Sequence, residues 1–301
     1  MKNIPDNFPL TLDDGKYIRN LNKEIEISTY MIGTYEDKSK KQYIAKIWSG
    51  EVKNAQYYEL KNELEAYLAL WSILSKNIKE VVSNFPDIQI PRLNYSEVSD
   101  NQILILIQKI DSKPMELNSI EIRWKSLCRV LEYFKFISNL ATDNEVKKIH
   151  HKQTWKFILS LPLLMFVALI KHPRLLKELL YASSYLIKKS RYVLFSKNLG
   201  LVHRDLNSSN TLYKNGRITI LDFQLLSLTV LSHDFGNFFY EMWKPDNSKQ
   251  LDKLLLSKGV NKLSSEEEFM LIYSVLFDLS FGTEKSEQEA KQYIFHLQEI
   301  L

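Results

Sequence analysis

The stretch from Leu201 to Asp222 restricts the possible fold more than any other part of this sequence. A polar loop is followed by two short β-type runs, Thr-Leu-Tyr-Lys and Arg-Ile-Thr-Ile-Leu, which are separated by Asn215-Gly216. An Asn-Gly pair between two such runs is a strong signal for a tight β-hairpin. A hairpin would return the chain to its starting point, so Asp222 at its end should lie beside Asn210 at its beginning.

The polar loop itself, His203 to Asn210, matches the pattern His-Arg-Asp-Leu-x-x-x-Asn at every fixed position. Phosphoryl transfer requires a carboxylate where the acceptor hydroxyl arrives and, one tight loop later, an amide oxygen that faces a metal ion. Asp205 meets the first requirement and Asn210 the second. The alternative is a solvated turn, because Asp, Ser and Asn are common in loops. We predict that Asp205 and Asn210 are catalytic and that Asn210 also binds metal.

Two aspartates compete for the role of second metal ligand. Asp222 ends a predicted strand and is followed by Phe-Gln, whereas Asp234 is followed by Phe-Gly and spells the familiar Asp-Phe-Gly. We predict Mg²⁺ binding by Asp222, because the hairpin places it beside Asn210 and no strand directly precedes Asp234. We expect Asp234 to be a buried carboxylate that accepts backbone N–H bonds from the catalytic loop.

The N-terminal part of the chain predicts a small β-sheet with one helix. Alternating β-branched and aromatic residues indicate three antiparallel strands between residues 17 and 48, and two more strands at 90–98 and 101–110. Residues 55–75 have the apolar spacing of an amphipathic helix. A sheet that carries one inserted helix should therefore occupy about the first 110 residues.

One lysine of this sheet is a candidate phosphate ligand. Lys46 lies in the apolar strand Tyr-Ile-Ala-Lys-Ile-Trp, from which its ammonium group can reach phosphate groups. On the following helix, Glu63 lies at the edge of the apolar face and is predicted to hold Lys46 in an ion pair. Glu59, one turn earlier on the same side, is the rival, and Glu65 should face solvent.

After residue 111 the pattern is almost wholly helical, apart from the catalytic loop and its hairpin. Helices are expected at 121–140, at 153–170 with a break or kink at Pro162, and at 174–195. Capping boxes are predicted at Ser265 and Ser286, and a helix end at Gly282.

The order of these features resembles the protein-kinase-like superfamily. Lys46, Glu63, the extended segment 104–110, the catalytic loop and Asp222 follow one another within about residues 25–243. The similarity is closest to aminoglycoside phosphotransferases, choline kinases and lipopolysaccharide core kinases. A long helical stretch precedes the catalytic loop, no Ala-Pro-Glu follows Asp222, and about eleven residues separate Asp222 from Asp234. That segment is too short for the activation loop of a regulated protein kinase.

The resemblance implies a nucleotide site between two lobes. The backbone around Gln108 to Ile110 would receive the adenine, and Lys46, positioned by Glu63, would contact the phosphates of ATP. The chain departs from the pattern in one respect, because no Gly-x-Gly-x-x-Gly precedes Lys46 and the phosphate-covering turn is expected at 19–23. A loop without these glycines also suits a non-catalytic relative.

The basic residues are concentrated in one segment. The net charge is +4, but residues 146–200 hold eleven lysines and arginines and a single acid, Glu178. The apolar run at 157–170 is shorter than the roughly 20 residues that span a bilayer. We expect 153–195 to form a C-lobe helix pair that is buried against the rest of the lobe with its cations in solvent. The alternative is a helix pair lying on an anionic membrane surface.

Composition bears on location and on other sites. The only cysteine, Cys128, excludes an internal disulfide, and the opening residues have no apolar signal core. We therefore expect a cytoplasmic protein, with peripheral contact at the inner face of the membrane as an alternative and no nucleic acid partner. Three histidines are expected at the surface and not as metal ligands: His150, His151 and His172.

We predict an α+β, two-lobed protein-kinase-like fold, with the N-lobe at 1–110 and a mainly helical C-lobe at 111–301. The predicted activity is the ATP- and Mg²⁺-dependent transfer of the γ-phosphoryl group to a hydroxyl of a small molecule, sugar or lipid-linked glycan. The alternatives are a serine/threonine protein kinase and a non-catalytic pseudokinase scaffold.

Overall fold

One antiparallel sheet forms the N-terminal part of the protein. The computed structural model describes residues 28–36, 40–146, 149–151, 154–242 and 263–282. The strands of this sheet lie in the order β1 (Ser28–Glu36), β2 (Gln42–Gly50), β5 (Gln102–Gln108) and β4 (Leu93–Val98). Lys46 of β2 lies opposite Ile32 of β1 and Ile105 of β5. Because side chains alternate between the faces of a strand, Lys46 shares a face with Trp48.

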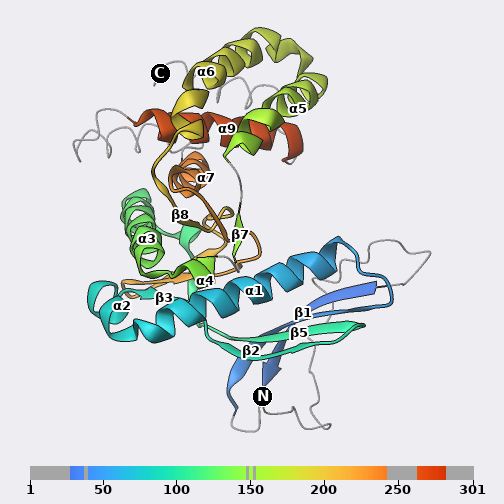
Figure 1. The fold of residues 1–301 in the computed structure, drawn as a ribbon, viewed down its shortest axis with the longest axis vertical. Coiled ribbons are helices and arrows are strands. Elements are labelled where there is room, and N and C mark those ends of the chain that lie inside the picture. The colour runs from blue at the N-terminus through green and yellow to red at the C-terminus, as the bar shows by residue number, and fades with distance from the viewer. Residues whose placement is uncertain (1–27, 37–39, 147–148, 152–153, 243–262, 283–301) are drawn as a thin grey trace.

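Helix α1 (Ala55–Lys76) packs against the Trp48 face of the sheet (Figure 1). The side chain of Asn54 caps the helix by accepting hydrogen bonds from Tyr57 N and Trp48 Nε1, each at 3.1 Å. Large buried residues of α1 recur every three or four positions, as in an amphipathic helix: Leu60, Leu64, Tyr67, Leu70 and Leu74. The helix predicted at 55–75 is confirmed. It is followed by α2 (Ile78–Asn84) and the short β3 (Ile88–Gln89).

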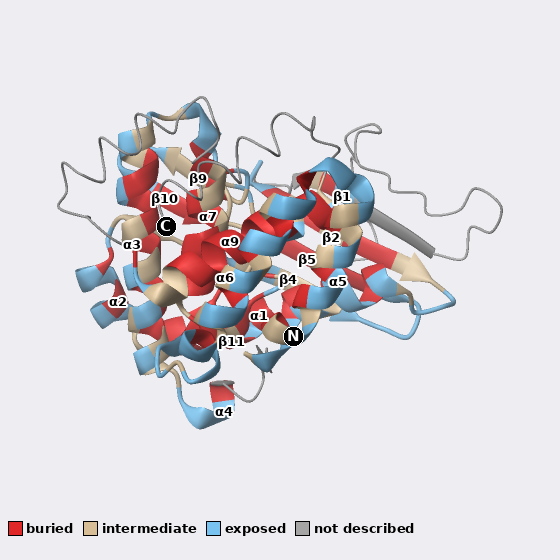
Figure 2. Cartoon of the chain, turned by 90° about the horizontal axis from the view of Figure 1, so that it is seen from above, coloured by how far each residue is buried: buried red, intermediate tan, exposed pale blue. Residues whose placement is uncertain are grey.

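Helices make up most of the remaining described chain. They are the 3₁₀ turn η1 (Met115–Leu117), α3 (Ile120–Leu140), α4 (Asp143–Val146), α5 (Trp155–Lys171), η2 (Pro173–Leu175), α6 (Leu176–Leu194), α7 (Ser232–Met242) and α9 (Ser265–Phe281). In Figure 1, α5 and α6 lie together at the end of the molecule opposite the sheet of β1, β2, β5 and β4. Both helices contact α9. Helices α7 and α9 pack on each other and are mostly buried (Figure 2).

Two small sheets flank the catalytic loop: the strand before the loop, β8 (Leu199–Val202), belongs to one of them, and the strand after it, β9 (Thr211–Lys214), belongs to the other. The sheet that contains β9 has the order β3, β10 (Arg217–Ile220), β9 and β6 (Lys113–Pro114), and the other β7 (His150–His151), β11 (Ser227–Val230) and β8. The turn between β9 and β10 has φ of 52° at Asn215 and 80° at Gly216. This is the left-handed geometry that two-residue hairpin turns require, and the predicted hairpin is present.

Some sequence predictions need correction. Helix α5 continues through Pro162, so no break occurs there. The capping box of α9 is formed by Ser264 and Glu267, one residue earlier than predicted, whereas the helix does end at Gly282. His172 is buried, not at the surface. The strand predicted from residue 17, the phosphate-covering turn at 19–23 and the capping box at Ser286 lie outside the described residues.

The predicted boundary between the two lobes at residue 110 is crossed by a pair of strands. Strand β3 lies within the predicted N-lobe range, yet it pairs in parallel with β10 of the catalytic hairpin. Arg129 of α3 donates three hydrogen bonds to Asp87, just before β3, at 3.0–3.2 Å. The segment 78–89 is thus attached to the helical part of the protein.

Candidate active site

Helix α7 holds the catalytic loop through a buried aspartate. Asp234, 1% exposed, accepts hydrogen bonds from His203 N and Arg204 N, both at 2.7 Å. Arg204 has a φ of 68°, a conformation that non-glycine residues adopt at a cost of about 1–3 kcal/mol. Asn237 of the same helix donates to Arg204 O at 2.9 Å. Asp234 therefore braces the strained loop through its backbone, in the way the sequence suggested.

The loop brings Asp205 and Asn210 into direct contact. Asn210 Nδ2 donates to Asp205 Oδ2 at 2.9 Å and to Asp205 O at 3.0 Å. Asn207 Nδ2 donates to Asp205 Oδ1 at 3.2 Å. Asn210 also lines the cavity described below, and its amide oxygen accepts no hydrogen bond from the described residues. Burial raises the pKa of Asp205 above its usual value, and the negative charge of Asp222 raises this pKa further.

The hairpin returns Asp222 to the same place. Asp222 follows β10 with a φ of 60°, and Leu221 N donates to Asn210 O at 2.9 Å. Asp222 Oδ1 lies 3.5 Å from Lys46 Nζ. This oxygen is buried and accepts no hydrogen bond from the described residues. A buried carboxylate oxygen without a donor is unfavourable unless a cation compensates it, so its environment suits a metal ion.

Lys46 and Glu63 form a close ion pair beneath the sheet. Lys46 Nζ donates to both carboxylate oxygens of Glu63 at 2.7 Å, and Glu63 is 1% exposed. Burial raises the pKa of Glu63 to about 7, although the charge of Lys46 opposes the rise. Glu59, the rival, is exposed. Glu65 is exposed as predicted and lies 3.9 Å from Lys61. Of Glu59 and Glu63, the structure brings Glu63 to Lys46.

These groups line one cavity of about 330 Å³ between the sheet and the hairpin. Its polar side is formed by Lys46, Glu63, Asn210 and Asp222. Its apolar walls come from opposite sides of the cavity, from the sheet and from the hairpin: Ile32, Ile44, Leu212 and Leu221. Two apolar walls with a charged end can accept a flat ring attached to an anionic group.

The segment predicted to receive adenine also borders this cavity. Its first two backbone donors are occupied, since Gln108 N donates to Arg92 O at 2.9 Å and Lys109 N donates to Gln42 O at 3.3 Å. Ile110 N makes no hydrogen bond to the described residues. Of the two residues predicted for this contact, Ile110 therefore keeps a free N–H and Gln108 does not.

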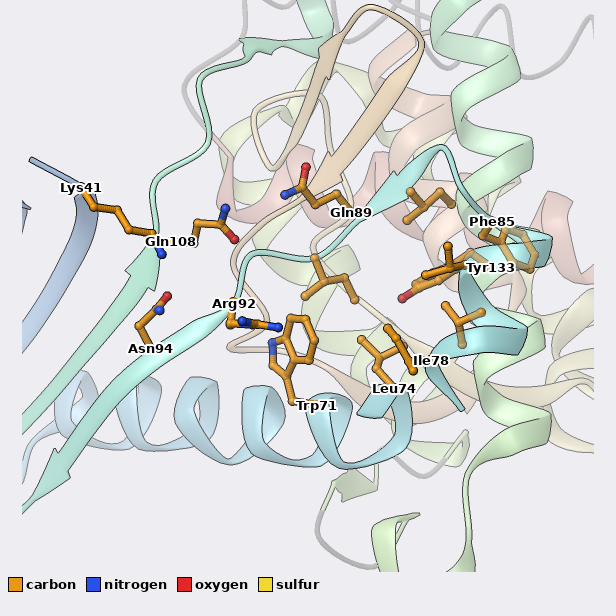
Figure 3. A pocket seen from close by; sticks show the side chains of 14 residues that line it. Lys41, Trp71, Leu74, Ile78, Phe85, Gln89, Arg92, Asn94, Gln108 and Tyr133 are labelled. Atoms are coloured by element: carbon orange, nitrogen blue, oxygen red, sulfur yellow. The ribbon is translucent and has the colours of Figure 1, made fainter. Parts of the chain in front are cut away.

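A second cavity, of about 360 Å³, lies behind this segment (Figure 3). Gln108 borders both cavities, and in Figure 3 its side chain lies with Arg92 and Asn94 at the rim of the second one. The floor is apolar and includes Trp71 and Phe85. None of the predicted catalytic or metal-binding residues lines it, so the smaller cavity is the candidate active site.

Sequence reasoning missed the residues that support the loop from its far side. Glu241 Oε2 accepts a hydrogen bond from Ser208 N at 2.5 Å, and Arg123 of α3 donates to Ser208 Oγ at 3.0 Å. A signal was present for one of them, because Asp234, Asn237 and Glu241 are spaced by three and four residues. That spacing places polar groups on one face of a helix.

The described residues contain no group of three or more His, Cys, Asp or Glu side chains that could hold a metal ion. The site thus offers the oxygens of Asn210 and Asp222, and further ligands would have to come from water or phosphate. Mg²⁺ is usually bound in this way, through one or two carboxylates together with substrate phosphates. The residues present fit a Mg²⁺–nucleotide complex.

Comparison with known proteins supports a phosphotransferase. Residues 166–259, less than half of the chain, match the model of the phosphotransferase enzyme family. No curated protein matches the chain in sequence. A match to phosphotransferase enzymes agrees with the prediction of a kinase that uses ATP and Mg²⁺.

Solved structures show the same fold at low sequence identity. A thermostable mutant of aminoglycoside phosphotransferase APH(4)-Ia, in complex with AMP-PNP and hygromycin B, has a TM-score of 0.53 and 15% identity, covering 95% of this chain and 93% of the other. Amicoumacin kinase hAmiN in complex with AMP-PNP, Ca²⁺ and Ami has a TM-score of 0.52 and 15% identity, covering 90% and 85%. The predicted protein-kinase-like α+β fold is confirmed.

Proposed function

We propose that this chain, which has the fold of aminoglycoside phosphotransferases, transfers the γ-phosphoryl group of ATP to a hydroxyl group of a small molecule. Lys46, Asn210 and Asp222 line one cavity, and Asn210 also donates a hydrogen bond to Asp205. This arrangement carries the proposal. The sugar or lipid-linked glycan class of the acceptor is a finer part of the same proposal. It is supported by the hydroxyl chemistry of the site and not by any contact with a sugar.

Each residue of the site would have a separate role in the reaction. Glu63 fixes the ammonium group of Lys46, which would donate to the α- and β-phosphates. Asn210 and Asp222 would hold Mg²⁺, which neutralises phosphate charge when it is bound. Asp205 would orient the acceptor hydroxyl and accept its proton. The hydrogen bonds from Asn207 and Asn210 hold its carboxylate in position for this role.

The base of the nucleotide would lie between the apolar walls of the cavity. Ile110 N would donate to the adenine, since this N–H has no partner among the described residues. Gln108 could contribute only its carbonyl group, because its N–H is occupied. On this basis we place the boundary between an N-lobe and a C-lobe at residues 110 and 111.

Two rival functions are less well supported. A protein kinase needs a platform for a peptide after the metal-binding aspartate. Here β11 begins at Ser227, only a few residues after Asp222, and is paired with β8. A pseudokinase scaffold would not need to keep three of the chemical groups at one cavity and Asp205 hydrogen-bonded to one of them, as this chain does.

We propose a cytoplasmic location at the inner face of a membrane. Cys128 is a free thiol, which suits a reducing compartment. No helix among the described residues is long and apolar enough to cross a bilayer. In this proposal, contact with the membrane is peripheral.

The function is tested by single-turnover transfer from ATP and Mg²⁺ to pooled sugars, glycolipids, aminoglycosides and choline. Asp205→Asn should lower the transfer rate by about 10²–10⁴-fold, the usual contribution of a general base. ADP binding should be unchanged. Asp100→Asn, in an exposed turn, is the matched control and should keep full activity. Equal activity of wild type and Asp205→Asn on an accepted substrate would overturn the assignment.

A further inference from the structure

Helix α5 is apolar on the face that it turns to solvent. Five of its large apolar residues are 44–67% exposed: Trp155, Leu159, Leu163, Phe166 and Ile170. Successive residues of an α-helix are about 100° apart, so these five lie within about 80° of one another around the helix. The buried residues of α5 lie on the opposite side: Phe157, Leu161, Leu164 and Ala168. One face packs in the core, and the other leaves a continuous apolar stripe uncovered.

Helix α6 repeats this arrangement. Leu176, Leu180, Ile187 and Leu194 are exposed and lie within about 40° of one another around the helix. Phe195, directly after the helix, is 81% exposed. Exposed apolar residues that occur singly are ordinary, but an aligned series on two neighbouring helices marks an interaction surface.

The two stripes face away from the core of the protein. On α5, the ring of Phe157 packs against that of Tyr273 of α9, with centroids 5.2 Å apart. On α6, Tyr185 and Lys189 both donate to Glu268 of α9, at 2.8 and 2.6 Å. These contacts come from the sides opposite the stripes, so both stripes point away from α9. We call the surface that they form the outer face of α5 and α6.

Cations lie along one edge of this outer face. The exposed ones between 155 and 195 are Lys156, Lys171, Arg174, Lys177, Lys188 and Arg191, and the only acid of that range is Glu178. Lys177 and Lys188 lie about 100–120° around α6 from Leu176, hence beside the stripe. Lys189, which binds Glu268, belongs to the inner side.

We propose that the outer face of α5 and α6 lies on an anionic lipid surface. Apolar side chains of such helices enter the boundary between head groups and acyl chains, while cations at their edges bind the anionic head groups. The same charges disfavour a second copy of this chain as the occupant. Two copies joined through this face would bring their cations together with only Glu178 to pair them.

The outer face and the active-site cavity are built from different elements. In Figure 1, α5 and α6 lie at the end of the molecule opposite the sheet of β1, β2, β5 and β4, which contributes residues to the cavity. None of the cavity's lining residues belongs to α5 or α6. Changes on the outer face should therefore leave nucleotide binding intact. Loss of lipid binding can then be separated from loss of the proposed transferase function.

The test is flotation of the full chain with vesicles of phosphatidylcholine alone or mixed with phosphatidylglycerol. Wild type should bind only the anionic vesicles, and binding should fall steeply in 0.5 M salt, because the screening length drops below about 10 Å. Phe166→Glu with Ile170→Glu should abolish binding. Lys177→Gln, Lys188→Gln and Arg191→Gln together should weaken it about 100-fold, from about fivefold for each cation.

The matched control is Leu68→Glu with Val82→Glu, which places the same charges at apolar residues of similar exposure on α1 and α2. It should bind vesicles as wild type does, and every variant should bind ADP. No binding of wild type to anionic vesicles, or equal binding by the Phe166 and Ile170 variant, would overturn the proposal. A wild-type dimer that this variant converts to a monomer would assign the face to a second copy instead.

Discussion

Replacing Asp234 by asparagine tests whether this residue braces the catalytic loop or binds the metal ion. Both carboxylate oxygens of Asp234 accept a backbone N–H of the catalytic loop at 2.7 Å. Asparagine keeps one acceptor and turns an NH₂ group toward the other N–H. One charge-assisted hydrogen bond is lost and one buried donor is left unpaired. From about 1.5–3 kcal/mol for such a bond, we expect Asp234→Asn to lower the free energy of unfolding by about 2–4 kcal/mol.

Asp222→Asn is the matched comparison, because it makes the same chemical change at the proposed metal ligand. Asp222 Oδ1 has no hydrogen-bond donor among the described residues, and its ion pair with Lys46 is 3.5 Å long. The loss of a long, partly exposed ion pair changes stability by at most about 1 kcal/mol. Asp222→Asn should therefore melt close to wild type and yet lose the Mg²⁺ dependence of nucleotide binding.

The two variants are compared by thermal unfolding and by calorimetric titration with ADP, with and without Mg²⁺. Asp234→Asn should melt roughly 3–6 °C below wild type, since an unfolding entropy of about 2.1 cal/mol/K per residue makes 1 kcal/mol correspond to about 1.6 °C in a chain of 301 residues. At temperatures where it is folded, Mg²⁺ should still strengthen its ADP binding. If Asp234→Asn melts within about 1 °C of wild type and loses this Mg²⁺ effect, Asp234 is the metal ligand and our reasoning is wrong.

Two further changes test the packing around the site. Burial opposes ionisation of Glu145, but hydrogen bonds from Lys76, Thr142 and Ser72 lower its pKa to about 2. A lowered pKa stabilises the fold above the unfolded value of about 4.5, so Glu145→Gln should destabilise the protein at pH 7. This difference in urea unfolding should vanish as the pH falls from about 4.5 to about 2, and a pH-independent difference would contradict the assignment. Gly216→Ala should cost about 1 kcal/mol in urea unfolding, because φ is +80° and nothing lies within 4 Å of an added Cβ; equal stability would refute the strained turn.

Local patterns predicted the parts of the site that are close in sequence. The Asn215-Gly216 turn determines that Asp222 returns to Asn210, because a two-residue hairpin has only one compatible register. The residues after Asp234 correctly indicated a helix, α7, but the strand β11, which ends at Val230 shortly before Asp234, was not predicted. Helical spacing favoured Glu63 as the partner of Lys46 and left Glu59 as a rival, and the structure brings Glu63 to Lys46. The catalytic roles of these residues, and the nucleotide contacts of Gln108 and Ile110, remain predictions.

Contacts between distant elements could not be predicted in this way. Arg123 on α3 reaches Ser208 across 85 positions of the sequence, and the spacing within α3 carries no sign of that partner. The pairing of β3 with β10 likewise depends on how the two parts of the chain approach each other. A two-residue strand has no recognisable period, so only the tertiary structure identifies it.

Helix α5 shows most clearly where sequence patterns become ambiguous. An amphipathic helix has one apolar face, and its period tells which residues are buried. In α5 both faces are apolar, so the pattern does not distinguish Leu164, which is buried, from Phe166, which is exposed. The expectation that the helix pair is buried against the lobe holds for the face toward α9, but the outer face is apolar where cations in solvent were expected. A helix that is apolar all round is normally buried on all sides. The uncovered half of α5, with lysines and arginines along one edge, therefore requires a partner that is both apolar and anionic.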